Sequence, residues 1–239
     1  MRRSSTKCRK DRTGCTRSNG WDGYRIGVYL IGGKVRVLTR NLHDWTNEFP
    51  SIVKAVSQLK AKDVMIDGEA FVADPQGMSH FNLLQRALGR GGDRHSIMLA
   101  VFDLPLVNGE NLRDLPLTER RGRLRHLLGS LPPLGIVFSD AIEGDPGEIL
   151  KQACAFGLEG VVSKRRDSPY RSGRREEWVK TKCINSDEFI VIGYEPGGSY
   201  GGVGSLLLAT AKNERLVYVG GVGTGFNSRT APQCRPLRR

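Results

Sequence analysis

The residues with the clearest chemical potential are two acids and two lysines at predicted strands. Lys180 and Lys182 are two residues apart in a predicted strand, so their side chains point to the same face. Two ammonium groups on one face suit a polyphosphate. Glu69 and Glu159 stand at predicted strand ends and offer the carboxylate oxygens that Mg²⁺ prefers. The plainer alternatives are a solvated lysine face and acids in ordinary turns and ion pairs.

One aromatic residue accompanies these charges. Phe102 lies in Phe102-Asp103-Leu104, at the end of an apolar run over residues 96–104 that is typical of a buried strand. Its ring suits stacking on a nucleotide base, and the alternative is a core side chain.

Several common catalytic motifs are absent from the sequence. Gly33-Lys34 is followed by Val35, so there is no Walker A loop, and neither HExxH nor GxGxxG occurs. Gly197-Gly198-Ser199-Tyr200-Gly201 matches GxSxG formally, but it lies in a glycine-rich turn between predicted strands, whereas a nucleophile elbow joins a strand to a helix. The histidines form no spaced pair and are interpreted as surface or packing residues: His43, His80, His95 and His126.

Composition indicates a globular chain. With 239 residues, 38% apolar and 26% charged, it can bury a sizeable core without a disulfide scaffold. No apolar run approaches the ~20 residues of a membrane span, and no signal peptide is visible. The five cysteines are scattered, odd in number and without CxxC, which favours a reducing compartment and argues against a zinc site. We therefore expect a soluble, cytosolic protein.

The net charge of +12 is concentrated at the two ends of the chain. Residues 1–20 hold seven Lys or Arg and one Asp, and residues 228–239 hold four Arg and no acid. The 207 residues between them therefore carry only +2. We expect a disordered basic leader over 1–20, a disordered basic tail over 228–239 and a nearly neutral folded body.

The elements that must position these side chains follow from periodicity and turn signals. Polar and apolar residues alternate over 24–30 and 34–40 around Gly32-Gly33, which predicts a hairpin. Asp145-Pro146 with Glu148 predicts the start of a helix that Gly157 ends. Other predicted helices cover 48–59, 81–88 and 117–128, and other predicted strands cover 64–66, 70–73, 96–104, 160–163 and 178–181.

The sequence pattern changes after Cys183. Short strands are predicted at 189–192, 206–209 and 216–219, separated by glycine-rich turns, as in a small barrel. Three strands cannot close a five-stranded barrel, so the second domain looks incomplete. We expect a main domain over 21–183 and a partial domain over 184–227.

Taken in order, the motifs resemble the covalent nucleotidyltransferase superfamily of ATP-dependent DNA ligases, RNA ligases and capping enzymes. Five short motifs carry this resemblance: Trp21-Asp22-Gly23-Tyr24-Arg25, Asp67-Gly68-Glu69, Phe102-Asp103-Leu104, Glu159-Gly160-Val161-Val162-Ser163-Lys164 and Trp178-Val179-Lys180-Thr181-Lys182. Three further segments resemble the ligase module of bacterial end-joining DNA ligases, over roughly residues 21–227: Thr39 to Thr46, Ser168 to Arg174 and Val222 to Phe226.

This resemblance implies a fold and a reaction. The fold is α+β: an adenylation domain of antiparallel sheets with flanking helices, followed by a truncated OB-fold β-barrel. The reaction uses ATP and Mg²⁺ to seal nicked double-stranded DNA in repair or recombination. A lysine takes AMP from ATP, AMP passes to the 5′-phosphate of the nick, and the 3′-hydroxyl displaces AMP. A monomer in the bacterial cytosol is expected.

The resemblance also assigns roles to individual residues. The catalytic set is Asp22, Glu69, Glu159, Lys180 and Lys182. The ATP-binding set is Arg25, Arg40, Glu69, Phe102, Lys180 and Lys182, with Phe102 stacking on adenine. Glu69 and Glu159 are the expected metal ligands.

The sequence departs from the family pattern at its most important position. The family motif is Lys-x-Asp-Gly-x-Arg, and Gly20 stands where the nucleophilic lysine belongs. A glycine cannot form the covalent intermediate. Lys7 and Lys10 lie upstream without motif context, and Gly221 stands where the family usually has Arg. The final lysine-bearing motif of the OB domain is also missing, so we expect a fragment with foreign ends, such as a frameshifted or mis-started reading.

The sequence leaves three alternative functions open. The first is a working ATP-dependent DNA ligase. The second is a degenerate fragment that binds nucleotide or nicked DNA without catalysis, which Gly20 favours. The third is an RNA ligase or capping-type enzyme, against which Asp44-Trp45-Thr46 and the Gly223-Thr224-Gly225-Phe226 segment argue.

Overall fold

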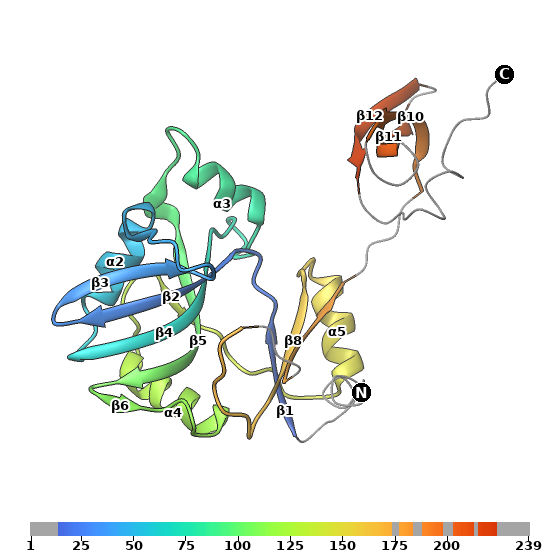
Figure 1. The fold of residues 1–239 in the computed structure, drawn as a ribbon. Helices are drawn as coiled ribbons and strands as arrows, with labels where there is room; N and C mark the ends of the chain where they lie inside the picture. The colour runs from blue at the N-terminus through green and yellow to red at the C-terminus, as the bar shows by residue number, and fades with distance from the viewer. Residues whose placement is uncertain (1–13, 174–176, 184–187, 198–202, 213–214, 224–239) are drawn as a thin grey trace. The chain divides into compact units, whose positions relative to one another are not determined.

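The computed structural model describes residues 14–173, 177–183, 188–197, 203–212 and 215–223. The chain divides into two compact units, Met1–Cys183 and Ile184–Arg239, which are described separately (Figure 1). The expected tail over 228–239, most of the expected leader, Lys7, Lys10 and the central Ser199 of the GxSxG match lie outside the described residues.

A six-stranded sheet forms the centre of the first unit. Its strand order is β3-β2-β4-β5-β6, all neighbours are antiparallel, and β7 adds to β5 in parallel. The predicted hairpin is confirmed: Gly32 and Gly33 turn between β2 and β3 with φ of +56° and +76°, values that glycine adopts without strain. The strands are β2 Tyr24–Ile31, β3 Lys34–Thr39, β4 Asp63–Phe71, β5 Met98–Val107, β6 Glu110–Asn111 and β7 Ile136–Phe138.

Strand β4 corrects one prediction. The sequence predicts two short strands on either side of Asp67-Gly68-Glu69, but β4 runs through all three residues. Its register with β5 shifts on both sides of Asp67, as at a β-bulge. Asp67 is tolerated inside the sheet because Arg25 on β2 forms two hydrogen bonds with its carboxylate. Gly68 is required there, since a Cβ would lie 2.7 Å from the Ala100 carbonyl oxygen.

Helices pack against this sheet and share one core with it. Fully buried Ile52, Ile66, Leu84, Leu99 and Leu124 belong to a single cluster. The predicted helices over 81–88 and 117–128 are confirmed, whereas the helix predicted over 48–59 is shorter because Pro50 begins it. The helical elements are η1 Thr46–Glu48, α2 Pro50–Val56, α3 Phe81–Leu88, η2 Arg94–Ser96 and α4 Leu117–Leu128.

A second, smaller sheet lies beside helix α5 (Figure 1). It has the order β1-β8-β9 and comprises β1 Cys15–Asn19, β8 Gly160–Arg165 and β9 Trp178–Lys182. Helix α5, Pro146–Ala155, packs on β8 through Ile149, Ala153 and Val161. The Asp145 carboxylate accepts hydrogen bonds from the Gly147 and Glu148 amides, as the predicted helix start requires.

Strand β1 contradicts part of the expected leader. The composition predicts disorder over residues 15–19, but they pair with β8 in antiparallel register from Cys15↔Arg165 to Asn19↔Val161. Thr16 and Ser18 are only 8% and 4% exposed. The segment has no apolar alternation, and backbone pairing with an available strand holds it instead.

The cysteines also differ from expectation, because Cys154 and Cys183 form a disulfide. They are 29 residues apart in the chain, and no sequence signal shows that the end of α5 and the end of β9 meet.

The second unit contributes one antiparallel sheet of order β10-β11-β12. Its strands, β10 Ile190–Pro196, β11 Val203–Lys212 and β12 Arg215–Val222, confirm the three predicted strands. The described residues of this unit form an open sheet and close no barrel. Across the described residues of the whole chain, no helix is long and apolar enough to cross a lipid bilayer.

Candidate active site

A cavity of about 300 Å³ lies between the two sheets of the first unit. The large sheet contributes Arg25 from β2, Glu69 from β4 and Phe102 from β5. The small sheet contributes Val162 and Lys164 from β8, Trp178 and Lys180 from β9, and the end of β1 with Gly20. We call this cavity the interface pocket. It has the size of a small-molecule site.

We call the cluster of Phe102, Lys164 and Trp178 the base end of the interface pocket, because the sequence predicts that Phe102 stacks on a base. The rings of Phe102 and Trp178 meet edge to face, with centroids 5.5 Å apart. The Lys164 Nζ lies 4.3 Å from the Phe102 centroid and 4.4 Å from that of Trp178, within cation–π range. Phe102 is only 5% exposed, and the part of it that lines the interface pocket lies beside Lys164 and Trp178.

Lys164 is an unusual residue for such a cluster. It is 3% exposed, and burial, reinforced by the charge of Arg121, lowers the pKa of its ammonium group to about 7.

Arg25 is held in place by a buried carboxylate and a tyrosine. Its Nε donates to Asp67 Oδ1 at 3.0 Å, and its terminal nitrogen donates to Oδ2 at 2.6 Å. The Tyr170 hydroxyl donates to the same Oδ2 at 3.1 Å. Burial opposes the charge of Arg25, but the ion pair with Asp67 outweighs it and raises the pKa of the guanidinium. Arg25 therefore stays charged, and its guanidinium carbon lies over the Trp178 ring, 5.0 Å from the ring centroid.

A second ion pair supports the same region. The guanidinium of Arg120 on α4 and the Asp103 carboxylate are both 0% exposed and form two hydrogen bonds of 2.7 and 2.8 Å. Arg120 also donates to the Ser168 carbonyl oxygen at 2.9 Å, which fixes the segment that leads to Tyr170.

We call the set of Glu159, Lys180 and Lys182 the phosphate end, because the sequence predicts that the two lysines face a phosphate. Of the three, Lys180 is the one that lines the interface pocket. Both lysines of β9 bond to the Glu159 carboxylate: Lys182 Nζ reaches Oε1 at 2.9 Å, and Lys180 Nζ reaches Oε2. Burial would raise the pKa of Glu159, but the hydrogen bonds from the two lysines lower it. The Lys182 side chain is 66% exposed, and this end is open to solvent.

Glu69 completes the acidic part of the site. Burial raises the pKa of its carboxyl group to about 7, with Glu159 and Asp67 adding to the shift and Lys180 and Arg25 opposing it. Among the described residues, no group of three or more His, Cys, Asp or Glu side chains could hold a metal ion. Glu69 and Glu159 offer carboxylate oxygens of the type that Mg²⁺ takes while it keeps several waters and binds substrate phosphates, and their role as its ligands stays a prediction.

Gly20 lies at the phosphate end, directly after β1. Its amide donates to the Gly160 carbonyl oxygen at 2.8 Å. A Cβ at this position would lie 3.1 Å from that oxygen and 3.3 Å from Lys180 Cε. The position therefore faces the place where the lysines meet Glu159, and glycine supplies no nucleophile there.

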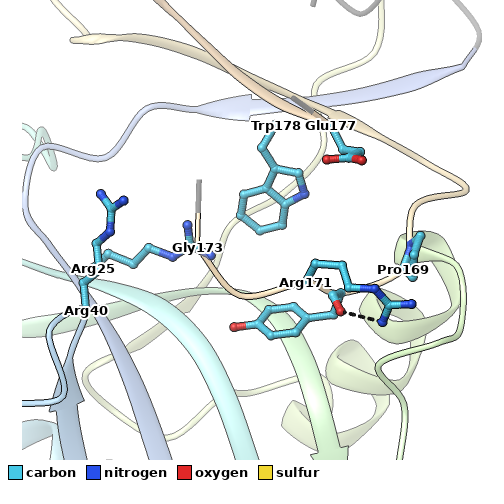
Figure 2. A pocket seen from close by; sticks show the side chains of 8 residues that line it. Arg25, Arg40, Pro169, Arg171, Gly173, Glu177 and Trp178 are labelled. Atoms are coloured by element: carbon cyan, nitrogen blue, oxygen red, sulfur yellow. Dashed lines mark hydrogen bonds between the residues drawn. The ribbon is translucent and has the colours of Figure 1, made fainter. Parts of the chain in front are cut away.

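Two predicted site residues have other surroundings. Asp22 does not line the interface pocket: its carboxylate accepts from the Phe81 amide at 2.9 Å and so caps α3. Arg40 lines it but is exposed, and it also lines a neighbouring cavity with Arg25, Arg171 and Trp178. Figure 2 shows Arg25 and Arg40 to the left of Trp178, and Pro169 and Arg171 to its right.

Sequence reasoning missed three residues of the site. Lys164 shares the strand face of Val162, so two-residue spacing could have placed it in the pocket. Asp67 enters only as the first residue of the Asp67-Gly68-Glu69 motif between two predicted strands, and Tyr170 has no predicted role. Their link across 103 residues has no local signal.

Comparisons with known proteins identify the family. A family model described as the ATP dependent DNA ligase domain matches residues 6–182, so the match begins upstream of Gly20. The chain is 43% identical over 220 residues to the multifunctional non-homologous end joining protein LigD of Pseudomonas aeruginosa, covering 90% of the chain and 26% of LigD. It is 30% identical over 234 residues to a probable DNA ligase of Dictyoglomus turgidum, covering 88% of the chain and 40% of that protein.

A solved structure agrees. The structure titled mycobacterial DNA ligase D complexed with ATP and MES superimposes with a TM-score of 0.65 at 31% identity, over 94% of the chain and 71% of that structure. The chain spans about a quarter of the length of the LigD proteins that it matches. The resemblance found in the motifs is thus confirmed, and the chain belongs to the family of ATP-dependent DNA ligase domains, with the LigD end-joining ligases among its relatives.

Proposed function

We propose that this chain is a DNA ligase core that cannot charge itself with AMP but can seal a nick whose 5′ end already carries AMP. The observation that carries the proposal is Gly20 at the phosphate end of the interface pocket, beside Lys180 and in the place of the nucleophilic lysine. We further propose that the chain acts on nicked double-stranded DNA, as a monomer in the bacterial cytosol.

The first step, transfer of AMP from ATP to the enzyme, fails because it needs a neutral amine next to the α-phosphate. Lys180 is engaged as an ammonium by the Glu159 carboxylate. Lys164 has a low pKa, but its Nζ lies against the rings of Phe102 and Trp178 at the base end. Neither lysine supplies a free amine where the α-phosphate is expected.

The sealing step has different needs. The 3′-oxygen forms a bond to the 5′-phosphorus, the bond from that phosphorus to AMP breaks, and the hydroxyl proton leaves to solvent. This step requires alignment and neutralisation of phosphate charge, and no enzyme amine forms a bond. Lys180, Lys182, Arg25 and Arg40 supply the positive charge. Mg²⁺, held by Glu69 and Glu159, would add a Lewis acid at the phosphate oxygens.

Two assays test the proposal on the intact chain. With α-labelled ATP and Mg²⁺, we expect no covalent label on the protein. With a nicked duplex that carries a 5′-adenylate, we expect slow sealing that weakens with salt. Covalent labelling of the unmodified chain would mean that another residue is the nucleophile.

Gly20→Lys is the matching gain-of-function variant, and Gly20→Ala is its control. Both introduce the same Cβ near the Gly160 carbonyl oxygen and Lys180, but only the lysine variant brings an amine. We expect label on Gly20→Lys and none on Gly20→Ala.

The second candidate is a fragment that binds nucleotide or nicked DNA without chemistry. It is favoured by the same glycine and predicts binding of ATP without sealing of the adenylylated nick. Absence of sealing in the unmodified chain and in Gly20→Lys, together with measurable ATP binding, would select this alternative.

A further inference from the structure

We infer that Cys154 and Cys183 form a reversible thiol–disulfide site that fastens the lysine-bearing strand β9 to helix α5. The site is independent of whether the chain seals DNA. It consists of the two sulfur atoms, which are bonded in the structure between Cα atoms 5.3 Å apart. Its reaction partner is a small disulfide such as oxidised glutathione.

The position of the bond gives it a mechanical role. Cys154 belongs to the last turn of α5, and Cys183 directly follows Lys182 at the end of β9. The covalent loop that the bond closes contains Glu159, Lys180 and Lys182. Opening or closing the bond therefore acts on the segment that carries these charges.

Strand β9 needs such a fastening because it is an edge strand. Among the described residues, the order is β1-β8-β9, and β9 pairs with β8 alone, over five residues from Gly160↔Lys182 to Lys164↔Trp178. Beyond Lys182, one backbone hydrogen bond continues the ladder, from the Cys183 amide to the Glu159 carbonyl oxygen at 3.0 Å. Without the disulfide, the end of β9 can fray at the residues that bind Glu159.

Access favours reversible chemistry at this site. Cys154 is exposed and Cys183 is half-buried, so small thiols and disulfides reach the bond. In the oxidation, the Cys154 thiolate attacks one sulfur of glutathione disulfide, and one glutathione leaves. The Cys183 thiolate then attacks the Cys154 sulfur, the Cys154–Cys183 bond forms, and the second glutathione leaves. The two cysteines lose two electrons and two protons, which end on two glutathione thiols.

A reducing cytosol would keep the pair as thiols, and an oxidising shift would close it. The closed form has a phosphate end that is held in register with Glu159. We expect slower amide exchange in β9 and a melting temperature higher by about 5 °C in the closed form, since the cross-link restricts the unfolded chain.

The experiment equilibrates the full chain in glutathione buffers from fully reducing to fully oxidising and blocks free thiols with N-ethylmaleimide. Mass spectrometry of the unreduced digest then measures the linked peptide that contains Cys154 and Cys183. Hydrogen exchange of the β9 peptide is followed in the same samples. We expect the linked peptide to rise with oxidant and the exchange of β9 to slow several-fold in parallel.

Three variants make the result specific. Cys154→Ser and Cys154→Ala should both exchange like the reduced chain at every buffer composition, and agreement between them excludes a folding defect of one variant. Cys234→Ser, which removes a different thiol, should respond like the unmodified chain. No linked peptide in the oxidising buffer would overturn the proposal, and so would a linked peptide that leaves the exchange of β9 unchanged.

Discussion

The two ends of the interface pocket are built in opposite ways. At the base end, Phe102 and Lys164 are 5% and 3% exposed, and Phe102 directly precedes Asp103, which forms a fully buried ion pair with Arg120. At the phosphate end, the Lys180 and Lys182 side chains are 35% and 66% exposed and are held mainly by one carboxylate. The base end is part of the core, whereas the phosphate end is a charge arrangement on an edge strand. Changes at the first should therefore alter folding, and changes at the second should alter chemistry.

Asp103→Asn is expected to have the largest effect, and it tests whether the base end supports folding. It leaves the buried Arg120 guanidinium without its carboxylate, so the free energy of unfolding should fall by about 3–5 kcal/mol. Urea denaturation measures this loss. Arg123→Met is the control, since it breaks an exposed pair with Glu110 and should cost at most about 1 kcal/mol. Equal losses in both variants would contradict a base end built on a buried ion pair.

At the phosphate end, Glu159→Gln should impair sealing and leave the stability of the fold almost unchanged. Lys180 and Lys182 lose the charge that gathers them, so sealing of a 5′-adenylylated nick should slow by about 100-fold. The free energy of unfolding should change by less than about 1 kcal/mol. Glu143→Gln is the control, because that side chain is 87% exposed and pairs with Arg166. A large loss of stability with normal sealing would reverse our assignment of the two ends.

Glu69→Gln tests the raised pKa of Glu69 through the pH dependence of stability. The folded chain holds the Glu69 proton up to about pH 7, because its pKa is raised to that value, whereas the unfolded chain releases the proton near the ordinary pKa of 4.5. Between these values the folded state binds the extra proton, so stability falls as pH rises through this window. Glutamine does not titrate, so the variant should be more stable by about 1–3 kcal/mol above pH 7 and unchanged near pH 4. Thermal melts at both pH values measure the difference.

Phe102→Leu tests the base end by binding. The substitution keeps an apolar side chain but removes the ring, so ATP affinity should fall by about 1 kcal/mol, roughly five-fold. Calorimetry measures it, with Phe156→Leu as control because Phe156 is 75% exposed. Unchanged affinity would mean that ATP does not reach this cluster.

The smallest expected effect belongs to Lys182→Ala. ATP binding should weaken by less than about 1 kcal/mol at low salt, and the difference should shrink as salt screens the charge. Lys54→Ala on α2 should change nothing. A salt-independent loss at Lys182 would indicate a packing role.

Local patterns predicted much of this fold. Helices α3 and α4 and the β2–β3 hairpin have side-chain periodicity or turn residues that leave few alternatives. The prediction divided strand β4 wrongly because Asp67-Gly68 is a turn signal, and only the distant Arg25 and Tyr170 make Asp67 acceptable inside a strand. Strand β1 was missed because it has no apolar pattern and forms by pairing with β8.

In the candidate site too, local motifs predicted some residues, whereas contacts between distant segments were missed. Motif order singled out Arg25, Glu69, Phe102 and Lys180, and all four line the interface pocket, although their roles stay predictions. Lys164 entered only as the last residue of a motif. The position of its ammonium against Phe102 and Trp178 depends on two strands from different sheets, which no single segment encodes.

Strand β1 has a consequence for how loss of activity would be noticed. Its place in the sheet is secured by main-chain hydrogen bonds to β8, which any extended peptide can form. An extended segment that fits the buried positions of Cys15, Thr16 and Ser18 can fill this slot, including one that delivers glycine to position 20. Expression, solubility and melting screens would therefore pass such a chain, and only a chemical assay would separate it from a competent enzyme.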